Sequence, residues 1–298
     1  MALSFYSNTN EAISFEDVTK SLEEKIIFGN EKSLLSCTDL LFKICNNPDF
    51  LSDFINKRLT ENLETYQTGN AYSEQSIIMH DCNKFFIRAT YWPKLLKNLR
   101  VREAHNNLFS YGLIHDHNFP LLTGGYLGSG YKTKLWEYNH DDVIGYSGEK
   151  VEVKFLEETT LHPGKVMYYR PSQDIHCQLP PEEEDSVAIN IILKTRQHFK
   201  KKQFEFDVEK NENKKVLDGT LAHLINFIKL STIVNTEKTK NLLVDIAKNY
   251  KIAKIRLEAI NSLNKIENTN SFWKMGIDDK DDVVSKFSKF KYENLQVL

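Results

Sequence analysis

The sequence "LHPGKVMYYRPSQDIHCQL", from Leu161 to Leu179, has the pattern of short β-strands separated by tight turns. Pro163-Gly164 has the composition of a turn, and a mainly apolar run follows as far as Tyr169. Pro171-Ser172 marks a second break, and the next strand is predicted to begin near His176. This stretch therefore predicts a β-rich fold that places a histidine early in one of its strands.

The same strand-and-turn pattern extends outward over residues 73–210. Glycines are concentrated in this region, as expected for turns between short strands. The predicted strand segments are "SIIMHDCNKFFIRATYW" (two strands around a turn at 81–84), "YKTKLWEY", "KVEVKFLEE", "GKVMYYR", "SVAINIIL" and "KQFEFDV". Many short strands with glycine turns indicate a sandwich, a jelly roll or a barrel.

A second histidine-bearing segment lies upstream, in "YGLIHDHNFPLLTGG". His115 and His117 are separated by one residue, and residues i and i+2 of a strand point to the same side. Two imidazoles in this arrangement can occupy adjacent positions around Fe, Zn, Cu or Ni. Taken alone, the spacing also fits two exposed histidines in a loop.

Helical patterns flank the β-rich region on both sides. Residues 1–72 are predicted to form an N-terminal helical segment, with a capping box from Ser14 to Asp17 and a helix stop at Pro48. Residues 211–298 are predicted to form a C-terminal helical segment whose last helix pair resembles a HEAT repeat. The motif "NENKK", 211–215, is the expected linker between the β-region and this segment.

Composition narrows the class of protein. Lys and Arg number 39 against 41 Asp and Glu, so we expect no nucleic-acid partner. The sequence has no apolar run of membrane-spanning length, and its first residues lack the features of a signal peptide, so a cytoplasmic location without a membrane partner is expected. The four cysteines form no CxxC motif and fit free thiols. No P-loop, GxSxG or HExxH motif is present.

Together, the two histidine segments resemble the two conserved motifs of the cupin superfamily. The first cupin motif begins with HxH in a strand and ends at a glycine, here Gly128. The second has a proline-glycine turn, a short strand and a histidine after another turn. The resemblance covers about residues 75 to 208. It implies an α+β protein with a cupin-type double-stranded β-helix, a jelly-roll barrel, flanked by helical segments and holding a metal near the barrel axis.

The resemblance also implies a set of metal ligands, His115, His117 and His176. Where the first motif usually has a glutamate ligand, this chain has Leu121. The three-histidine set is similar to that of the cysteine-dioxygenase-like branch of non-haem iron enzymes. It implies Fe(II), with Zn, Ni or Mn as alternatives, and no organic cofactor is predicted. The serine-histidine-tyrosine relay of that branch is absent from "SVAINIILK", which puts cysteine itself in doubt as substrate.

Candidate substrate-binding and catalytic residues surround these motifs. By analogy with the branch, Arg88 or Arg102 would bind a substrate carboxylate. Arg170 either binds an anionic group or forms a salt bridge facing solvent. The remaining candidates are Tyr126 and Tyr168 as pocket-lining catalytic residues, Glu137 as an acid/base group or fourth ligand, and His140, for which a solvent-facing turn is the favoured alternative.

The function that we expect is that of a non-haem Fe(II) oxygenase or dioxygenase. Its substrates would be O2 and a thiol, an amino acid or an amino-acid derivative, including one bound to a peptide or carrier protein. Two alternatives stay open: a non-oxidative metal-dependent cupin, such as an isomerase or lyase, and a non-enzymatic ligand-binding module. The helical flanks either bind a protein partner or a second copy, or only cap the barrel.

Overall fold

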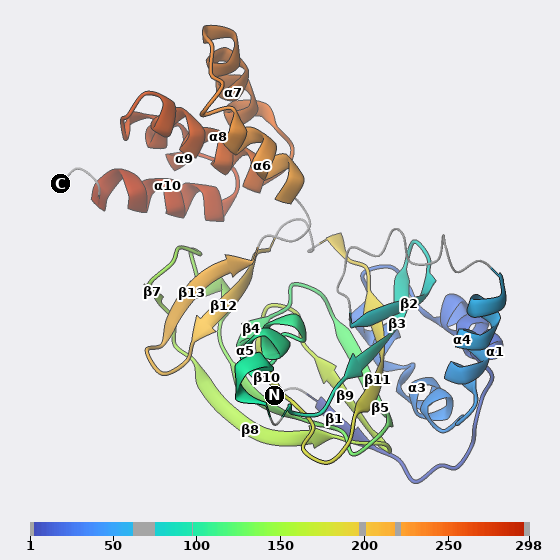
Figure 1. Cartoon of the computed structure of the whole chain (residues 1–298). Helices are drawn as coiled ribbons and strands as arrows, with labels where there is room; N and C mark the ends of the chain where they lie inside the picture. The colour runs from blue at the N-terminus through green and yellow to red at the C-terminus, as the bar shows by residue number, and fades with distance from the viewer. Residues whose placement is uncertain (1–2, 62–74, 97, 197–200, 218–221, 295–298) are drawn as a thin grey trace. The chain divides into compact units, whose positions relative to one another are not determined.

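The computed structural model describes residues 3–61, 75–96, 98–196, 201–217 and 222–294 (Figure 1). The chain divides into two compact units. The first comprises Met1–Tyr138 and Glu152–Arg196, and the second comprises Asn139–Val151 and Gln197–Leu298. The predicted boundary between residues 72 and 73 lies outside the described residues. The predicted boundary at 210/211 falls between two paired strands of the second unit.

Two antiparallel sheets form the β-structure of the first unit. One has the strand order β1 (Leu3–Tyr6), β9 (Lys165–Tyr169), β5 (Leu121–Leu127), β11 (Ser186–Leu193), β3 (Phe85–Trp92) and β2 (Ser76–Asp81). The other contains, in order, β4 (His115–Asp116), β10 (Asp174–Leu179), β6 (Tyr131–Glu137) and β8 (Lys154–Leu161). Antiparallel sheets combined with helices confirm the α+β class.

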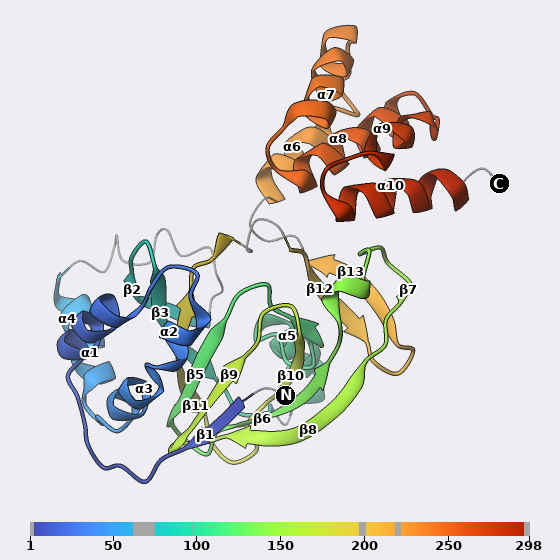
Figure 2. The same ribbon diagram turned by 180° about the vertical axis from the view of Figure 1, so that it is seen from behind.

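Helices cover one face of the first sheet (Figure 2). The helices are α1 (Phe15–Lys25), α2 (Glu31–Leu35), α3 (Thr38–Cys45) and α4 (Phe50–Glu61). The predicted cap is confirmed, since the Ser14 Oγ accepts a hydrogen bond from the Asp17 amide at 3.1 Å. Apolar residues of these helices, such as Leu22 and Leu41, share a buried core with outward-facing strand residues such as Ile189. This core lies on the helical side of the sheet.

A second core lies on the opposite face of the same sheet. Strand β3 shows the division, because Phe85, Ile87 and Ala89 belong to the helical core whereas Phe86 and Trp92 belong to the second one. The second core also contains Leu135 of β6, a strand of the other sheet. This second core is therefore the interior of the β-structure. Successive side chains of a strand point to opposite faces, so every second residue of β3 faces this interior.

The second unit combines a small sheet with the C-terminal helices. Its strands pair in the order β7 (Glu149–Lys150), β13 (Glu212–Leu217) and β12 (Gln203–Asp207). Its helices are η1 (His140–Asp142), α6 (Ala222–Leu230), α7 (Glu237–Asn249), α8 (Ala253–Ile266), η3 (Ser271–Trp273), α9 (Lys274–Ile277) and α10 (Asp282–Asn294). The predicted helices near 237–250 and 251–266 are confirmed as α7 and α8, which pack through Leu243, Ala259 and Leu263.

Two local predictions need correction. The segment 211–215 is not a linker, because Glu212–Leu217 pairs with both β12 and β7. The strand predicted from Lys150 to Glu158 begins only at Lys154. Just before it, the Val151 amide donates to the Asn211 carbonyl at 2.9 Å and Val151 is buried, so this residue is held by the second unit's sheet.

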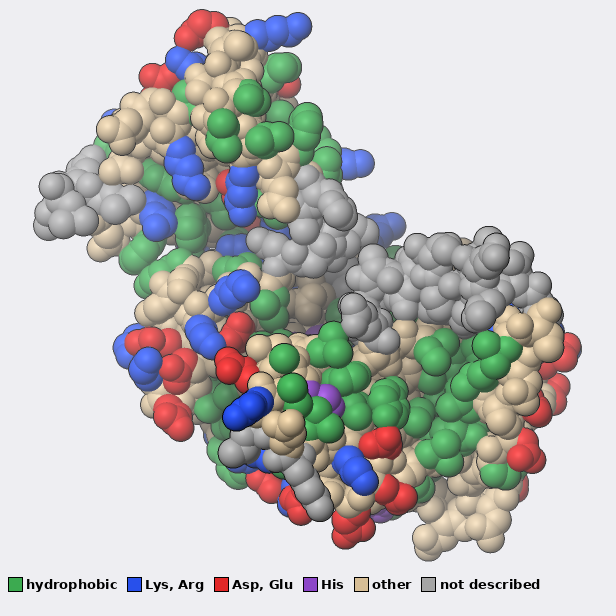
Figure 3. Space-filling view, in the orientation of Figure 1, with side chains coloured by type: hydrophobic (Ala, Val, Ile, Leu, Met, Phe, Trp, Pro, Cys, Tyr) green, Lys and Arg blue, Asp and Glu red, His purple; other side chains and the backbone are tan. Residues whose placement is uncertain are grey.

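Helix α5 (Leu99–Leu108) lies in the first unit between β3 and β4. All four cysteines are free, as predicted. Apolar side chains gather on the C-terminal helices in the view of Figure 3, and those exposed there include Phe227, Leu230 and Leu242. Among the described helices, none combines the length and the apolar character needed to cross a membrane.

Candidate metal centre

Strand pairing brings the three predicted histidines together. In the antiparallel pair of β4 and β10, His115 lies directly opposite His176. Residues opposite one another on neighbouring strands point to the same side, and His117 follows His115 by two positions. The ring centroids are 4.3 Å apart for His115 and His176, 4.5 Å for His117 and His176, and 5.0 Å for His115 and His117. One ring nitrogen of each residue lies within 4.8 Å of the other two.

Neighbouring groups fix the orientation of each ring. The Nδ1 of His115 is 3.1 Å from the Leu113 carbonyl oxygen. A carbonyl only accepts hydrogen bonds, so Nδ1 carries the proton and the Nε2 lone pair is left for a ligand bond. The His117 ring stacks on Phe119 with centroids 4.4 Å apart, and His176 lies 4.8 Å from the Tyr169 ring.

A backbone hydrogen bond also links the two histidine-bearing segments at this site. The Ser172 amide donates a 2.6 Å hydrogen bond to the His117 carbonyl. Ser172 has a φ of 55°, in the left-handed region that serine rarely adopts. The turn between β9 and β10 therefore holds the strand end that carries His117.

The electrostatic environment favours neutral imidazole at His176. Burial lowers the pKa of His176 well below the ordinary histidine value, and electrostatic repulsion from His115 and Arg88 adds to this effect. Neutral imidazole is the form that binds metal ions. Three imidazoles that converge from one side match the donor set of Fe, Zn, Ni or Cu. The residues present therefore fit a transition-metal ion.

Of the candidate arginines, Arg88 shares the interior with the histidines. Arg88 has the same strand parity as Phe86 and Trp92, which belong to the interior core, and its charge acts on His176. Its cross-strand neighbour is Asn190. Arg102 lies instead on α5, where its Nε donates to the Leu96 carbonyl at 2.9 Å.

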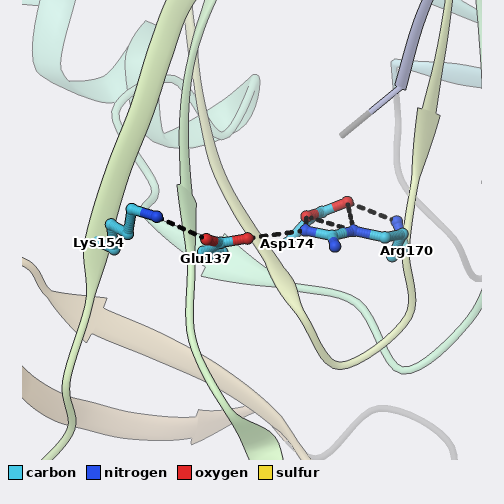
Figure 4. Close-up of polar contacts among 4 residues, drawn as sticks. All are labelled: Glu137, Lys154, Arg170 and Asp174. Carbon is cyan, nitrogen blue, oxygen red and sulfur yellow. Dashed lines mark hydrogen bonds and ion pairs between the residues drawn. The ribbon is translucent and has the colours of Figure 1, made fainter. Parts of the chain in front are cut away.

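Arg170 and Glu137 form an ion-pair network (Figure 4). Arg170 contacts the buried Asp174 carboxylate at 2.5 Å and Glu137 at 3.3 Å, and Lys154 contacts the other Glu137 oxygen at 3.3 Å. Burial acts against ionisation of Glu137, but hydrogen bonds from Arg170 and Lys154 outweigh it and lower the Glu137 pKa. Glu137 is thus kept ionised, and Arg170 is already engaged by two carboxylates.

The structure does not bring Tyr126 or Tyr168 to the histidines. Both belong to the core on the helical side of the first sheet. The Tyr126 hydroxyl donates to the Pro48 carbonyl at 2.8 Å, and the Tyr168 hydroxyl donates to Glu31 at 2.5 Å. His140, expected in a solvent-facing turn, is instead buried in the second unit beside Phe204, and burial lowers its pKa to about 4.

Sequence reasoning missed several polar residues of the interior. Tyr169 adjoins His176, and burial raises the pKa values of both Tyr169 and Tyr131, so these phenols keep their protons. The Thr123 hydroxyl donates to Asn190 at 2.5 Å, and the Asn190 amide donates to Thr90 at 2.7 Å. A buried asparagine in the otherwise apolar strand "SVAINIIL" is the signal that marks this network.

Comparisons with known proteins return structures of low similarity. No protein-family model matches the sequence, and no curated protein matches it. Hydroquinone 1,2-dioxygenase from Sphingomonas sp. TTNP3 is 7% identical with a TM-score of 0.29, over 42% of this chain and 69% of that one. DMSP lyase DddQ from Ruegeria pomeroyi DSS-3 is 14% identical with a TM-score of 0.23, over 43% of this chain and 53% of that one.

A third solved structure has a similar level of likeness. RmlC from Streptococcus suis, in complex with dTDP-D-xylose, is 9% identical with a TM-score of 0.21, over 47% of this chain and 53% of that one. TM-scores this low do not establish shared ancestry or activity.

Proposed function

We propose that the chain is a metal-dependent enzyme of the cupin superfamily, and specifically a non-haem Fe(II) dioxygenase. One observation carries the proposal: a ring nitrogen from each of His115, His117 and His176 lies within 4.8 Å of the other two, where β4 pairs with β10. His115, His117 and His176 would hold the ion. A three-imidazole iron site supplies oxygen activation because it leaves positions open for O2 and substrate.

The substrate class in this proposal is a small anion that carries a thiol or is derived from an amino acid. Arg88 supports it, because this side chain lies on the interior face and acts electrostatically on His176. A guanidinium binds a carboxylate through two parallel hydrogen bonds, which fixes both position and orientation. Tyr131 and Tyr169 would donate hydrogen bonds to the bound substrate, since both phenols keep their protons. A peptide- or carrier-bound form of the substrate belongs to the same proposal.

The experiment is metal analysis and oxygen consumption on untagged protein. The full chain is purified without a metal-binding tag, its metal content is measured, and oxygen uptake is followed with Fe(II) and a panel of small thiol and amino-acid carboxylates. Iron binding with substrate-dependent uptake supports the proposal. A chain that binds no transition metal, or a wild-type level of bound metal in the His115→Ala, His117→Ala and His176→Ala variants, refutes it.

A non-oxidative lyase or isomerase is the second candidate. It is favoured by the protonated phenol of Tyr169 beside His176, an arrangement suited to proton transfer. This reaction would use Zn, Ni or Mn and consume no oxygen. Turnover of a substrate under anaerobic conditions distinguishes it from the dioxygenase.

A further inference from the structure

A second cluster of metal-binding side chains lies in the first unit, apart from the three histidines. It consists of Glu23 on α1, His80 on β2 and Cys82 just after β2. One carboxylate oxygen, one ring nitrogen and the Cys82 Sγ all lie within 4.8 Å of one another. The His80 Nε2 is already 3.1 Å from the Glu23 carboxylate.

The local fold positions these groups from two elements. His80 and Cys82 are two residues apart at the β2–β3 hairpin, and a register shift between Ile78 and His80 redirects this end of the strand. Glu23 follows Leu22, which is fully buried against the sheet. The Lys84 ammonium donates to the Glu23 carbonyl at 2.6 Å, which ties the hairpin to the helix. Helix α1 and the β2–β3 hairpin therefore both fix the positions of these three side chains.

The cluster is also accessible from solvent. The side chains of Glu23 and His80 are 50% and 21% exposed, so an ion can reach them from solvent. The Cys82 Sγ donates a hydrogen bond to the Phe85 carbonyl at 3.4 Å, and metal binding would release this proton. The adjacent Asp81 is engaged by Lys194 at 2.5 Å. With the Cys82 proton released, the carboxylate and the thiolate would balance the charge of a divalent cation.

We propose that Glu23, His80 and Cys82 form a zinc site that joins α1 to the β2–β3 hairpin. Thiolate and imidazole ligands select zinc over magnesium or calcium, and three protein ligands leave the fourth tetrahedral position to water. Zinc–ligand bonds of about 2.0–2.3 Å require the outermost ligand atoms to close by roughly 1 Å. The half-exposed Glu23 side chain has the freedom to make that movement.

Cobalt(II) substitution tests the site selectively. Cobalt bound to a thiolate gives a near-ultraviolet charge-transfer absorption, whereas cobalt bound to three imidazoles does not. The full-length, untagged chain is titrated with Co(II), and the absorption is then displaced with Zn(II). We expect the absorption in the wild type and in the His117→Ala variant, and its loss in Cys82→Ser. Its intensity should fall in His80→Gln and Glu23→Gln.

Cys45→Ala provides the matched control. Burial raises the pKa of the Cys45 thiol and keeps it protonated, so its removal should leave the cobalt absorption unchanged. Absence of the absorption in the wild type, or its persistence in Cys82→Ser, overturns the zinc site. Because the His117→Ala variant is tested in parallel, this result is independent of the proposed enzyme activity.

Discussion

His176 lies directly opposite His115 in the pairing of β10 with β4, and their ring centroids are 4.3 Å apart. The two residues come from different sequence motifs, and one backbone register aligns them. A shift of this register by one residue would turn one of the two imidazoles to the opposite face. The register of a two-residue strand thus determines whether the histidine cluster exists.

Removal of any one histidine of the cluster should release the metal. Replacing His117 with Ala deletes a ligand atom, and even changes to groups that only orient ligands reduce metal affinity about 10- to 100-fold. We therefore expect a drop in affinity of more than about 100-fold, measured by competition with a chelator. The matched control is His162→Ala, since His162 is exposed and lies outside the cluster. Equal affinities of the two variants would contradict a three-histidine site.

Replacement of Arg88 should weaken substrate binding more than replacement of Arg102. Loss of a hydrogen bond to a charged group costs about 1.5–3 kcal/mol, which corresponds to a rise in KM of about 10- to 100-fold. Steady-state kinetics of Arg88→Gln and Arg102→Gln measure this difference. The Arg102 variant should stay near the wild type because the Arg102 Nε donates to the Leu96 carbonyl, just before α5. A larger effect at Arg102 would exclude Arg88 as the carboxylate anchor.

Adjacent tyrosines should respond differently to loss of the hydroxyl group. Tyr169→Phe removes a protonated phenol beside His176 and should lower kcat or shift its pH profile. Tyr168→Phe removes the hydrogen bond to the Glu31 carboxylate on the helical face and should cost about 1.5–3 kcal/mol of stability with kcat unchanged. Kinetics and chemical denaturation of both variants test this, and a kcat effect confined to Tyr168 would refute it.

The Glu137 ion pairs should make stability depend on pH. The folded-state pKa of Glu137 is lowered, so its contribution is present above the unfolded-state pKa of about 4.3 and is lost as the pH falls through the folded value. At neutral pH, Glu137→Gln should be less stable than the wild type, and the difference should vanish on acidification. Thermal denaturation across this range measures it. Glu152→Gln, at an exposed position, serves as the control. A pH-independent difference would contradict this account.

A buried ion pair should dominate the stability of the C-terminal helices. Arg256 on α8 contacts Asp279 at 2.5 and 2.7 Å, and both side chains are less than 10% exposed. Asp279→Asn leaves the buried guanidinium without its counter-charge, which costs about 3–5 kcal/mol. Glu293→Gln breaks an exposed pair with Lys289 and should cost less than about 1 kcal/mol. Urea unfolding followed by circular dichroism compares them, and equal losses would contradict the prediction.

Sequence periodicity predicted most of the strands and the shared side of His115 and His117, because both depend on local spacing, whereas His176 was predicted as a ligand only from the resemblance to the cupin motifs. It did not predict which tyrosine faces the interior. Tyr168 and Tyr169 have the same composition around them, and their faces follow from the pairing of β9 with β5. The strand β1 was also missed, since Leu3–Tyr6 becomes a strand only through its pairing with β9. In the same way, the polar composition of 211–215 predicted a linker, because the pairing with β12 and β7 that makes it a strand is not visible in local sequence.

The Ser172–His117 backbone hydrogen bond bears on how the proposed metal centre would form. His115 and His176 are 61 positions apart (176 − 115), so no short peptide of this chain contains the complete donor set. Contacts between residues so distant in sequence form late and slowly during folding. Metal capture should therefore report on completion of the β-structure, with the ion stabilising only chains in which the turn at Ser172 has closed on the strand end at His117.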